Sequence, residues 1–283
     1  MIVAYSTLED FLGDIVGKAR NGMGVSQEEL ARAVQLTSAD IGRVESYELT
    51  PDKDRIRALA GALGLQGEKL AGIAGGWMPR KPNDSEDAPS AAVERQILDV
   101  GMEVNCYILK CKTTGKGAIV DPGGGANLVL NLVDKMQAGI THILLTHGHA
   151  DHIGALGEVK DATQAPVYCS ELDFPLLGGW VDLVSEKVDE GWRTKVGELE
   201  VEAVKLPGHT PGGVGYRAGE LFFSGDALFA GSMGGARGAS VYKGQIEAVQ
   251  NRVLSLEREV RIFPGHGPMT TVGEEQDHNP FFA

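Results

Sequence analysis

The sequence predicts two units of different fold class: a small all-α unit at the N-terminus, and a larger α/β unit after it. Residues 1–78 carry helix-capping residues and amphipathic stripes, whereas residues 91–283 alternate strand-like apolar runs with glycine-rich turns. Between them, residues 79–90 (PRKPNDSEDAPS) hold three prolines and no apolar periodicity. This composition is typical of a linker.

Composition limits the classes of function. The chain has 283 residues and a formal charge of -13, which disfavours a nonspecific grip on nucleic acid or on anionic lipid. No apolar run is long enough to span a membrane, and the first residues, MIVAYSTLEDFLGD, are acidic where a signal peptide would be basic. The three cysteines lack CxxC spacing and indicate reduced thiols. We therefore expect a cytoplasmic protein without a membrane partner.

The N-terminal unit divides into five predicted helices. An amphipathic stripe marks the first, and Ser26 with Glu29 forms a capping box before the second. Thr37 or Ser38 caps the third, and Thr50, with Pro51 at the first helical position, opens the fourth. The predicted helices cover residues 7–20, 29–36, 38–48, 52–65 and 67–73.

The segment SQEELARAVQLTSADIGRVE places two short helices around a tight turn. Together with the later helices it resembles the lambda-repressor-like (Cro-type) helix-turn-helix family over about 65 residues. The resemblance implies DNA binding through the third helix, where Arg43 is the candidate DNA contact. Because Asp40 and Glu45 flank Arg43 in an acidic unit, we expect association or regulation rather than tight DNA binding. DNA and a second copy of the chain stay open as partners.

The run LLTHGHADHIGAL, residues 144–156, concentrates metal-ligand side chains between a predicted strand and a predicted helix. His147, His149, Asp151 and His152 lie in the connecting loop, where alternate side chains converge. Core packing does not produce this spacing, because each buried imidazole needs its own hydrogen-bond partners. Imidazoles with a carboxylate suit zinc, iron or manganese.

Three further segments end predicted strands on ligand-type residues. They are LEVEAVKLPGHTPGG with His209, ELFFSGDALF with Asp226 and VRIFPGHGPMT with His266. Five histidines and two aspartates are enough ligands for two metals that share a bridging carboxylate. His142, five residues before the cluster, is a buried histidine with partners of its own in the simplest interpretation.

The motifs HGHADH, GHTPG, FSGDALF and PGHGPM, with AIVDPGG, resemble the metallo-β-lactamase superfamily in its glyoxalase II-like branch, over residues 93–283. The resemblance implies an αββα sandwich and two divalent metal ions, with zinc favoured and iron or manganese as alternatives. It assigns His147, His149 and His209 to one metal and Asp151, His152 and His266 to the other. Asp226 would bridge the metals, and Asp121 would orient the ligands from behind.

By the same resemblance, the chain is a metal-dependent hydrolase that cleaves a small-molecule thioester, or a related ester or lactone, by a metal-bridging hydroxide. Asp151 and Asp226 are then the catalytic carboxylates. Glutathione-using members of this branch have a substrate-binding lysine shortly after the bridging aspartate. In this chain Gly234 and Gly235 occupy that region, and Arg237, Tyr242 or Lys243 are the candidate substitutes. Because every proposed ligand follows the linker, we expect residues 91–283 to act without the helical unit. The alternative is a DNA-binding transcriptional regulator whose metallo-hydrolase-fold domain senses a ligand.

Overall fold

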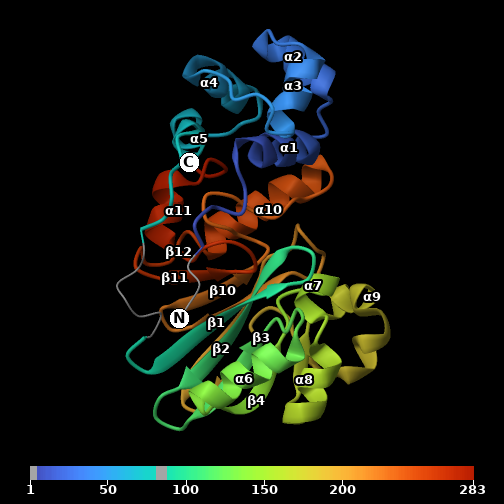
Figure 1. Cartoon of the computed structure of the whole chain (residues 1–283), viewed down its shortest axis with the longest axis vertical. Coiled ribbons are helices and arrows are strands. Elements are labelled where there is room, and N and C mark those ends of the chain that lie inside the picture. Colours follow the sequence, from blue (N-terminus) through green and yellow to red (C-terminus); the bar gives the residue numbers. More distant parts are fainter. Residues whose placement is uncertain (1–4, 81–87) are drawn as a thin grey trace.

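Two six-stranded sheets lie face to face in the computed structural model, which describes residues 5–80 and 88–283 (Figure 1). The first sheet has the order β1 (Ala91–Asp99), β2 (Glu103–Cys111), β3 (Lys116–Val120), β4 (Gly139–Leu144), β5 (Val167–Cys169) and β6 (Val184–Lys187). The second has the order β12 (Thr270–Thr271), β11 (Arg261–Pro264), β10 (Leu221–Gly225), β9 (Val214–Ala218), β8 (Leu199–Lys205) and β7 (Arg193–Val196). Strands β3 to β6 pair in parallel, as do β10 and β11, so their carboxyl ends meet at one edge.

Helices cover both outer faces. On the first sheet lie α6 (Ala126–Met136), α7 (Ala150–Ile153), α8 (Leu156–Thr163) and α9 (Phe174–Leu177), with 3₁₀ turns at Glu171–Asp173 and Gly178–Leu183. On the second lie α10 (Ala239–Arg252) and α11 (Val272–His278). Tyr107, Phe223 and Phe263 fill the space between the sheets, each at most 2 % exposed. The predicted αββα sandwich is confirmed.

The helical unit contains α1 (Leu12–Met23), α2 (Gln27–Val34), α3 (Ser38–Glu45), α4 (Lys53–Ala62) and α5 (Gly67–Ala74). The capping boxes at Ser26 and Thr37 are present as predicted. Two predicted starts are wrong. Helix α1 begins at Leu12 rather than residue 7, because the Asp14 carboxylate accepts the Phe11 N–H at 2.8 Å and fixes the first turn there.

The second wrong start is that of α4, which Asp52 caps in place of Thr50 by accepting the Arg55 N–H at 2.9 Å. The helix expected after His149 is split into α7 and α8. It breaks at Gly154, where the backbone passes so close to the Gly123 carbonyl that an added Cβ would lie 2.4 Å from that oxygen.

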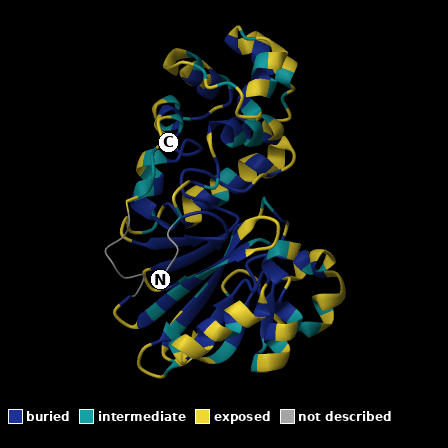
Figure 2. Cartoon of the chain, viewed as in Figure 1, coloured by how far each residue is buried: buried dark blue, intermediate teal, exposed yellow. Residues whose placement is uncertain are grey.

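One continuous apolar core joins the helical unit to the sandwich. Ile15 and Leu70 of the helical unit belong to the same buried cluster as Phe222 of β10, Val249 of α10 and Phe282 of the C-terminal tail. In Figure 2 the buried residues continue from the helical unit into the helices below it. The two units are therefore packed together and do not hang loosely from the linker. Most of the predicted linker, residues 81–87, lies outside the described residues.

No helix within residues 5–80 and 88–283 has the length and apolar character needed to cross a membrane.

Candidate metal centre

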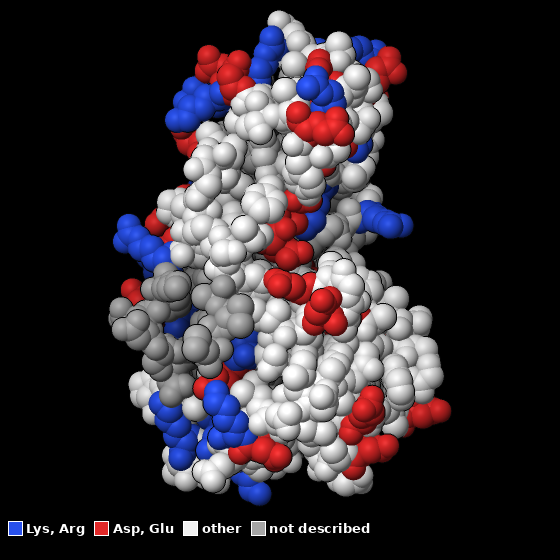
Figure 3. Space-filling view, viewed as in Figure 1, with Lys and Arg blue, Asp and Glu red and all other residues white. Residues whose placement is uncertain are grey.

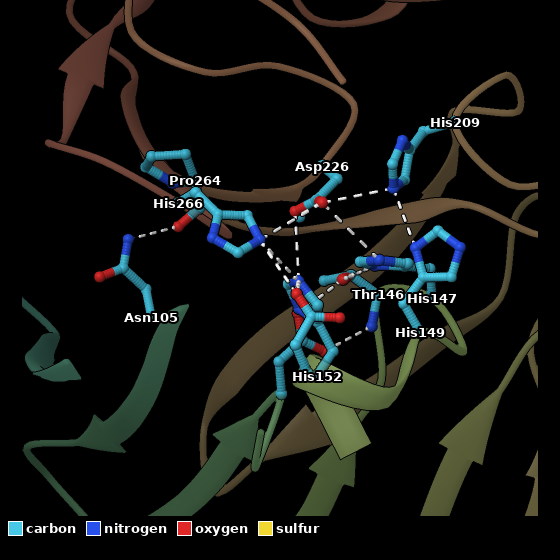
Figure 4. A network of polar contacts seen from close by, with 12 residues as sticks. Asn105, Thr146, His147, His149, His152, His209, Asp226, Pro264 and His266 are labelled. Atoms are coloured by element: carbon cyan, nitrogen blue, oxygen red, sulfur yellow. Dashed lines mark hydrogen bonds and ion pairs between the residues drawn. The ribbon is translucent and has the colours of Figure 1, made fainter. Parts of the chain in front are cut away.

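Seven candidate ligands meet at the carboxyl-end edge of the sheets, on loops that follow strands and on the short helix α7; Figure 4 labels six of them. The first group lies just after β4, where His149 is the N-cap residue of α7. The others come from the β8–β9 connection and from the residues directly after β10 and β11. The structure thus places side by side every ligand that the sequence predicts: His147, His149, Asp151, His152, His209, Asp226 and His266.

These side chains form two groups with one shared carboxylate. The ligand atoms of His147, His149 and His209 all lie within 4.8 Å of one another, and so do those of Asp151, His152 and His266. Asp226 lies between the groups: its Oδ2 is 3.3 Å from Nε2 of His209 and 3.5 Å from Nε2 of His266. This geometry suits two ions with a bridging aspartate.

Polar atoms at the centre lack hydrogen-bond partners, and a bound cation would supply the missing interaction. Nε2 of His147 is buried and makes no hydrogen bond, and the equally buried Oδ1 of Asp226 faces Nε2 of His152 at 3.3 Å without forming one. Nε2 of His209 faces Nδ1 of His149 at 3.0 Å. Buried polar atoms without partners are costly, and converging imidazole nitrogens with carboxylates are zinc- or iron-type ligands. The residues present therefore fit a pair of metal ions.

Three of the five histidine rings are held on their far side by an acceptor outside the ligand group. His209 donates its Nδ1–H to the carbonyl of Gly235 at 3.1 Å, and His266 donates to the carbonyl of Glu103 at 2.6 Å. His152 Nδ1 lies 3.0 Å from Oδ2 of Asp121. These contacts fix the tautomer that leaves Nε2 free to bind a metal.

Asp121 is a positioning residue behind the ligands. Besides His152, it accepts the Thr146 N–H at 2.7 Å and the Thr146 hydroxyl at 2.6 Å, and that hydroxyl lies 3.1 Å from Nδ1 of His147. Asp121, His147 and His152 could together hold a metal ion by position. The oxygens of Asp121 are, however, already engaged by Thr146 and His152, so we assign Asp121 to positioning. Its backbone has the left-handed φ of 53°, a conformation that aspartate adopts more readily than most other residues.

The pKa shifts of His147 and His209 run in the opposite direction to that of His152. Burial, reinforced by neighbouring imidazoles, lowers the pKa of His147 well below its usual range and also lowers that of His209. For His152 burial acts the same way, but the carboxylates of Asp226 and Asp121 outweigh it and raise its pKa to about 10. Burial opposes ionisation of Asp226 as well, yet the nearby imidazoles hold its pKa well below normal. Metal binding at His152 therefore competes with a proton.

Sequence reasoning missed two residues that organise these loops. The fully buried Asp173 accepts the Gly148 N–H at 3.0 Å and the Thr210 hydroxyl at 2.7 Å, so it links the His147–His149 loop to the His209 loop. Asn105 donates to the carbonyls of Pro264 and Gly267 and fixes the turn that carries His266. No local motif marks Asp173, because its partners are backbone and hydroxyl groups distant in sequence.

Other candidates lie away from the centre. His142 contacts Thr141 at 2.8 Å and Thr194 at 3.0 Å, and it stacks on Tyr168, so it is the satisfied buried histidine that was expected. Arg43 is exposed on α3, 3.6 Å from Asp40.

Comparison with known proteins identifies the family of this fold. The sequence model of the Metallo-beta-lactamase superfamily matches residues 100–266. The chain belongs to the metallo-beta-lactamase superfamily. It is thus a hydrolase of a metal-binding superfamily, and residues 16–70 match a helix-turn-helix family.

Relatives within the metallo-beta-lactamase superfamily have several activities. The hydroxyacylglutathione hydrolase GloC of Haemophilus influenzae is 31 % identical over 58 % of this chain and 86 % of its own length. The BLEG-1 B3 metallo-beta-lactamase aligns with a TM-score of 0.59 and 30 % identity, covering 68 % of this chain and 99 % of that one. TTHA1623 in a di-iron-bound form aligns with a TM-score of 0.56 and 32 % identity over 67 % and 100 %.

Proposed function

We propose that this chain is a dinuclear metal-dependent hydrolase that cleaves a small-molecule thioester, or a related ester or lactone. The observation that carries the proposal is the position of Asp226 between two three-residue ligand groups. His147, His149 and His209 would hold one ion and Asp151, His152 and His266 the other, with Asp226 shared. Zinc suits this ligand set, iron and manganese are the alternatives, and the di-iron neighbour supports iron as a competitor.

Two divalent ions, when bound, supply a water of lowered pKa and polarise the substrate carbonyl. The chain's own residues orient the reactants. Asp151 directs Oδ2 toward His266 at 3.3 Å, while its other oxygen has no partner among the described residues and is able to accept a hydrogen bond from the attacking water. Asp226, kept ionised by the imidazoles around it, fixes the spacing between the two groups.

A thioester is favoured because a thiolate leaves without receiving a proton. The three cysteines are free but buried, so none is offered as a covalent nucleophile. The similarity to a hydroxyacylglutathione hydrolase points the same way.

The test is a substrate screen on metal-loaded, full-length protein with a small acyl thioester, a γ-lactone and a β-lactam. We expect the thioester to be hydrolysed fastest and Asp226→Ala to lose about 10²- to 10³-fold in kcat, on the scale of removing a principal electrostatic group. Preferred hydrolysis of the β-lactam, or full activity in Asp226→Ala, would contradict the proposal.

A second candidate function is DNA binding by α2 and α3. The helix-turn-helix match favours it, as does the position of these helices at the end of the molecule farthest from the sheets (Figure 1). Arg43 is the candidate base contact, and the chain would then be a regulator that senses a ligand in its hydrolase-fold domain. Selection of a specific duplex by the full-length protein tests this role.

We propose residues 1–78, 79–90 and 91–283 as helical domain, linker and hydrolase domain. A cytoplasmic location is proposed from the three free thiols.

A further inference from the structure

An open cavity of about 800 Å³ lies beside the proposed metal centre, and both domains line it. His149 and His209 belong to its wall on the hydrolase side, together with the Pro207–Pro211 segment. On the opposite side, helix α1 of the helical domain contributes Lys18 and Asn21. A volume of this size is typical of a small-molecule site.

Helix α1 is fixed in this position by contacts with the hydrolase domain. The ring of Tyr242 on α10 packs so tightly on Gly22 that an added Cβ would lie 2.4 Å from it. Lys18 donates to the carbonyl of Met233 at 3.1 Å and also pairs with Asp10. Its ammonium lies 4.9 Å from the ring centroid of Phe229. The wall contributed by α1 is therefore preformed.

The cavity wall carries positive charge, although the chain as a whole is acidic and mixes both signs of charge on the face drawn in Figure 3. Its described lining residues include two cations, Lys18 and Arg237, and no carboxylate, whereas the chain has 26 basic and 39 acidic residues. Asp10 already balances Lys18, but Arg237 is exposed and has no ion-pair or hydrogen-bond partner among the described residues. The amide of Asn21 is likewise unengaged within the described part of the chain. One free guanidinium and one free amide donor suit a monoanion such as a carboxylate.

Tyr242 and Lys243, the other two candidate substitutes for the substrate-binding lysine, already have contacts of their own. Tyr242 is 6 % exposed and packs on α1. Lys243 does not line the cavity; its side chain is 78 % exposed and lies 3.7 Å from Glu247.

We propose that helix α1 of the helical domain completes the substrate pocket, and that the pocket selects acyl substrates carrying a carboxylate, bound by Arg237 with Asn21 opposite. This inference rests on the proposed hydrolase function, whose substrate class it narrows. The helical domain then has a role in the hydrolase site itself. Residues 91–283 alone would lack one wall of the pocket, contrary to the expectation from the sequence.

Two thioesters of the same thiol test the proposal on full-length, metal-loaded protein. Their acyl portions end in a carboxylate in one and in the corresponding carboxamide in the other. We expect wild type to favour the carboxylate by about tenfold in kcat/KM, the scale of a charge-assisted hydrogen bond. Arg237→Ala should bring the ratio near one through KM, and Asn21→Trp should raise KM for both probes by filling the cavity.

Lys243→Ala is the matched control, because this cation lies on the neighbouring helix α10 outside the cavity lining, and it should preserve the wild-type ratio. Asn21 is exposed, so its replacement leaves the core intact; unchanged metal content and circular dichroism verify this.

Binding of non-hydrolysable thioether analogues, measured by calorimetry, separates this inference from the proposed function. Tighter binding of the carboxylate analogue, weakened about tenfold in Arg237→Ala, supports the pocket even if no thioester is hydrolysed, a result that would refute the hydrolase alone. If wild type treats both probes and both analogues equally, and Asn21→Trp changes neither, the inference is overturned while the hydrolase proposal stands.

Discussion

Asp10 joins the helical domain to the loop that carries the proposed bridging residue, so its removal should weaken both stability and metal binding. The side chain is 6 % exposed, pairs with Lys18 and accepts a hydrogen bond from the Ser232 hydroxyl at 2.5 Å. Further along the same loop, the Gly235 carbonyl holds the ring of His209. Asp10 therefore acts on a candidate ligand through the loop backbone.

The magnitude of Asp10→Ala follows from the groups it leaves behind. Ser232 is fully buried, and an unsatisfied buried hydroxyl costs about 1–2 kcal/mol. Lys18 is 24 % exposed and regains water, so its lost ion pair adds only about 1 kcal/mol. We expect the free energy of unfolding to fall by about 2–3 kcal/mol. Asp10→Asn keeps an acceptor for Ser232 and should lose about half as much.

Urea unfolding of the metal-free protein measures the loss, and competition with a chelator measures metal affinity. We expect the affinity of the weaker-bound ion to fall by up to about tenfold, the lower end for groups that orient ligands indirectly. Asp54→Asn is the control, because its carboxylate is 93 % exposed and should change stability by less than about 0.5 kcal/mol. Unchanged stability and metal affinity in Asp10→Ala would refute the coupling between the two domains.

Three further predictions concern separate parts of the molecule. Asp121→Asn removes the carboxylate that orients His152 and should weaken metal binding about 10–100-fold in chelator competition; an unchanged affinity would exclude this role. Burial raises the pKa of Glu275 from 4.5 to about 7, so the folded protein holds a proton that the unfolded chain has released. The free energy of unfolding should therefore fall as the pH rises from about 4.5 to about 7, and it should fall less in Glu275→Gln. Urea unfolding at both ends of this range measures the two changes. Equal changes in wild type and Glu275→Gln would show that another group is the cause. Because Arg43 is the sole cation on α3, binding to random duplexes at physiological salt should be no tighter than micromolar; a nanomolar site lost in Arg43→Ala would establish the regulator instead.

The candidate ligands could be predicted because each is written locally. Imidazoles spaced two or three residues apart, and single ligands directly after β10 and β11, mark a strand-edge site without knowledge of the fold. Helix caps such as Ser26 are equally local and were predicted correctly. The predicted cap Thr50 was wrong because Asp52, two residues later, accepts the N–H of Arg55 and caps the helix instead.

The contacts between domains could not be predicted, because they join residues far apart in sequence. Lys18 donates to the carbonyl of Met233, which lies 215 positions further along the chain, and no motif near either residue predicts this contact. The sequence gives no reason for a glycine at position 22. In the structure the ring of Tyr242 occupies the space that a side chain at this position would need. The expectation that the hydrolase domain acts alone rested on the position of every proposed ligand after the linker, and the order of ligands along the chain does not show how much surface the two units share.

Metal stoichiometry tests the central claim most directly. Metal-free, full-length protein is saturated with zinc, freed of excess metal and analysed for metal per chain. We predict two ions for wild type, two for the control Asp161→Ala, whose carboxylate is exposed on α8, and at most one for Asp226→Ala, which lacks the shared ligand. One ion or fewer in saturated wild type, or two in Asp226→Ala, would contradict the dinuclear centre.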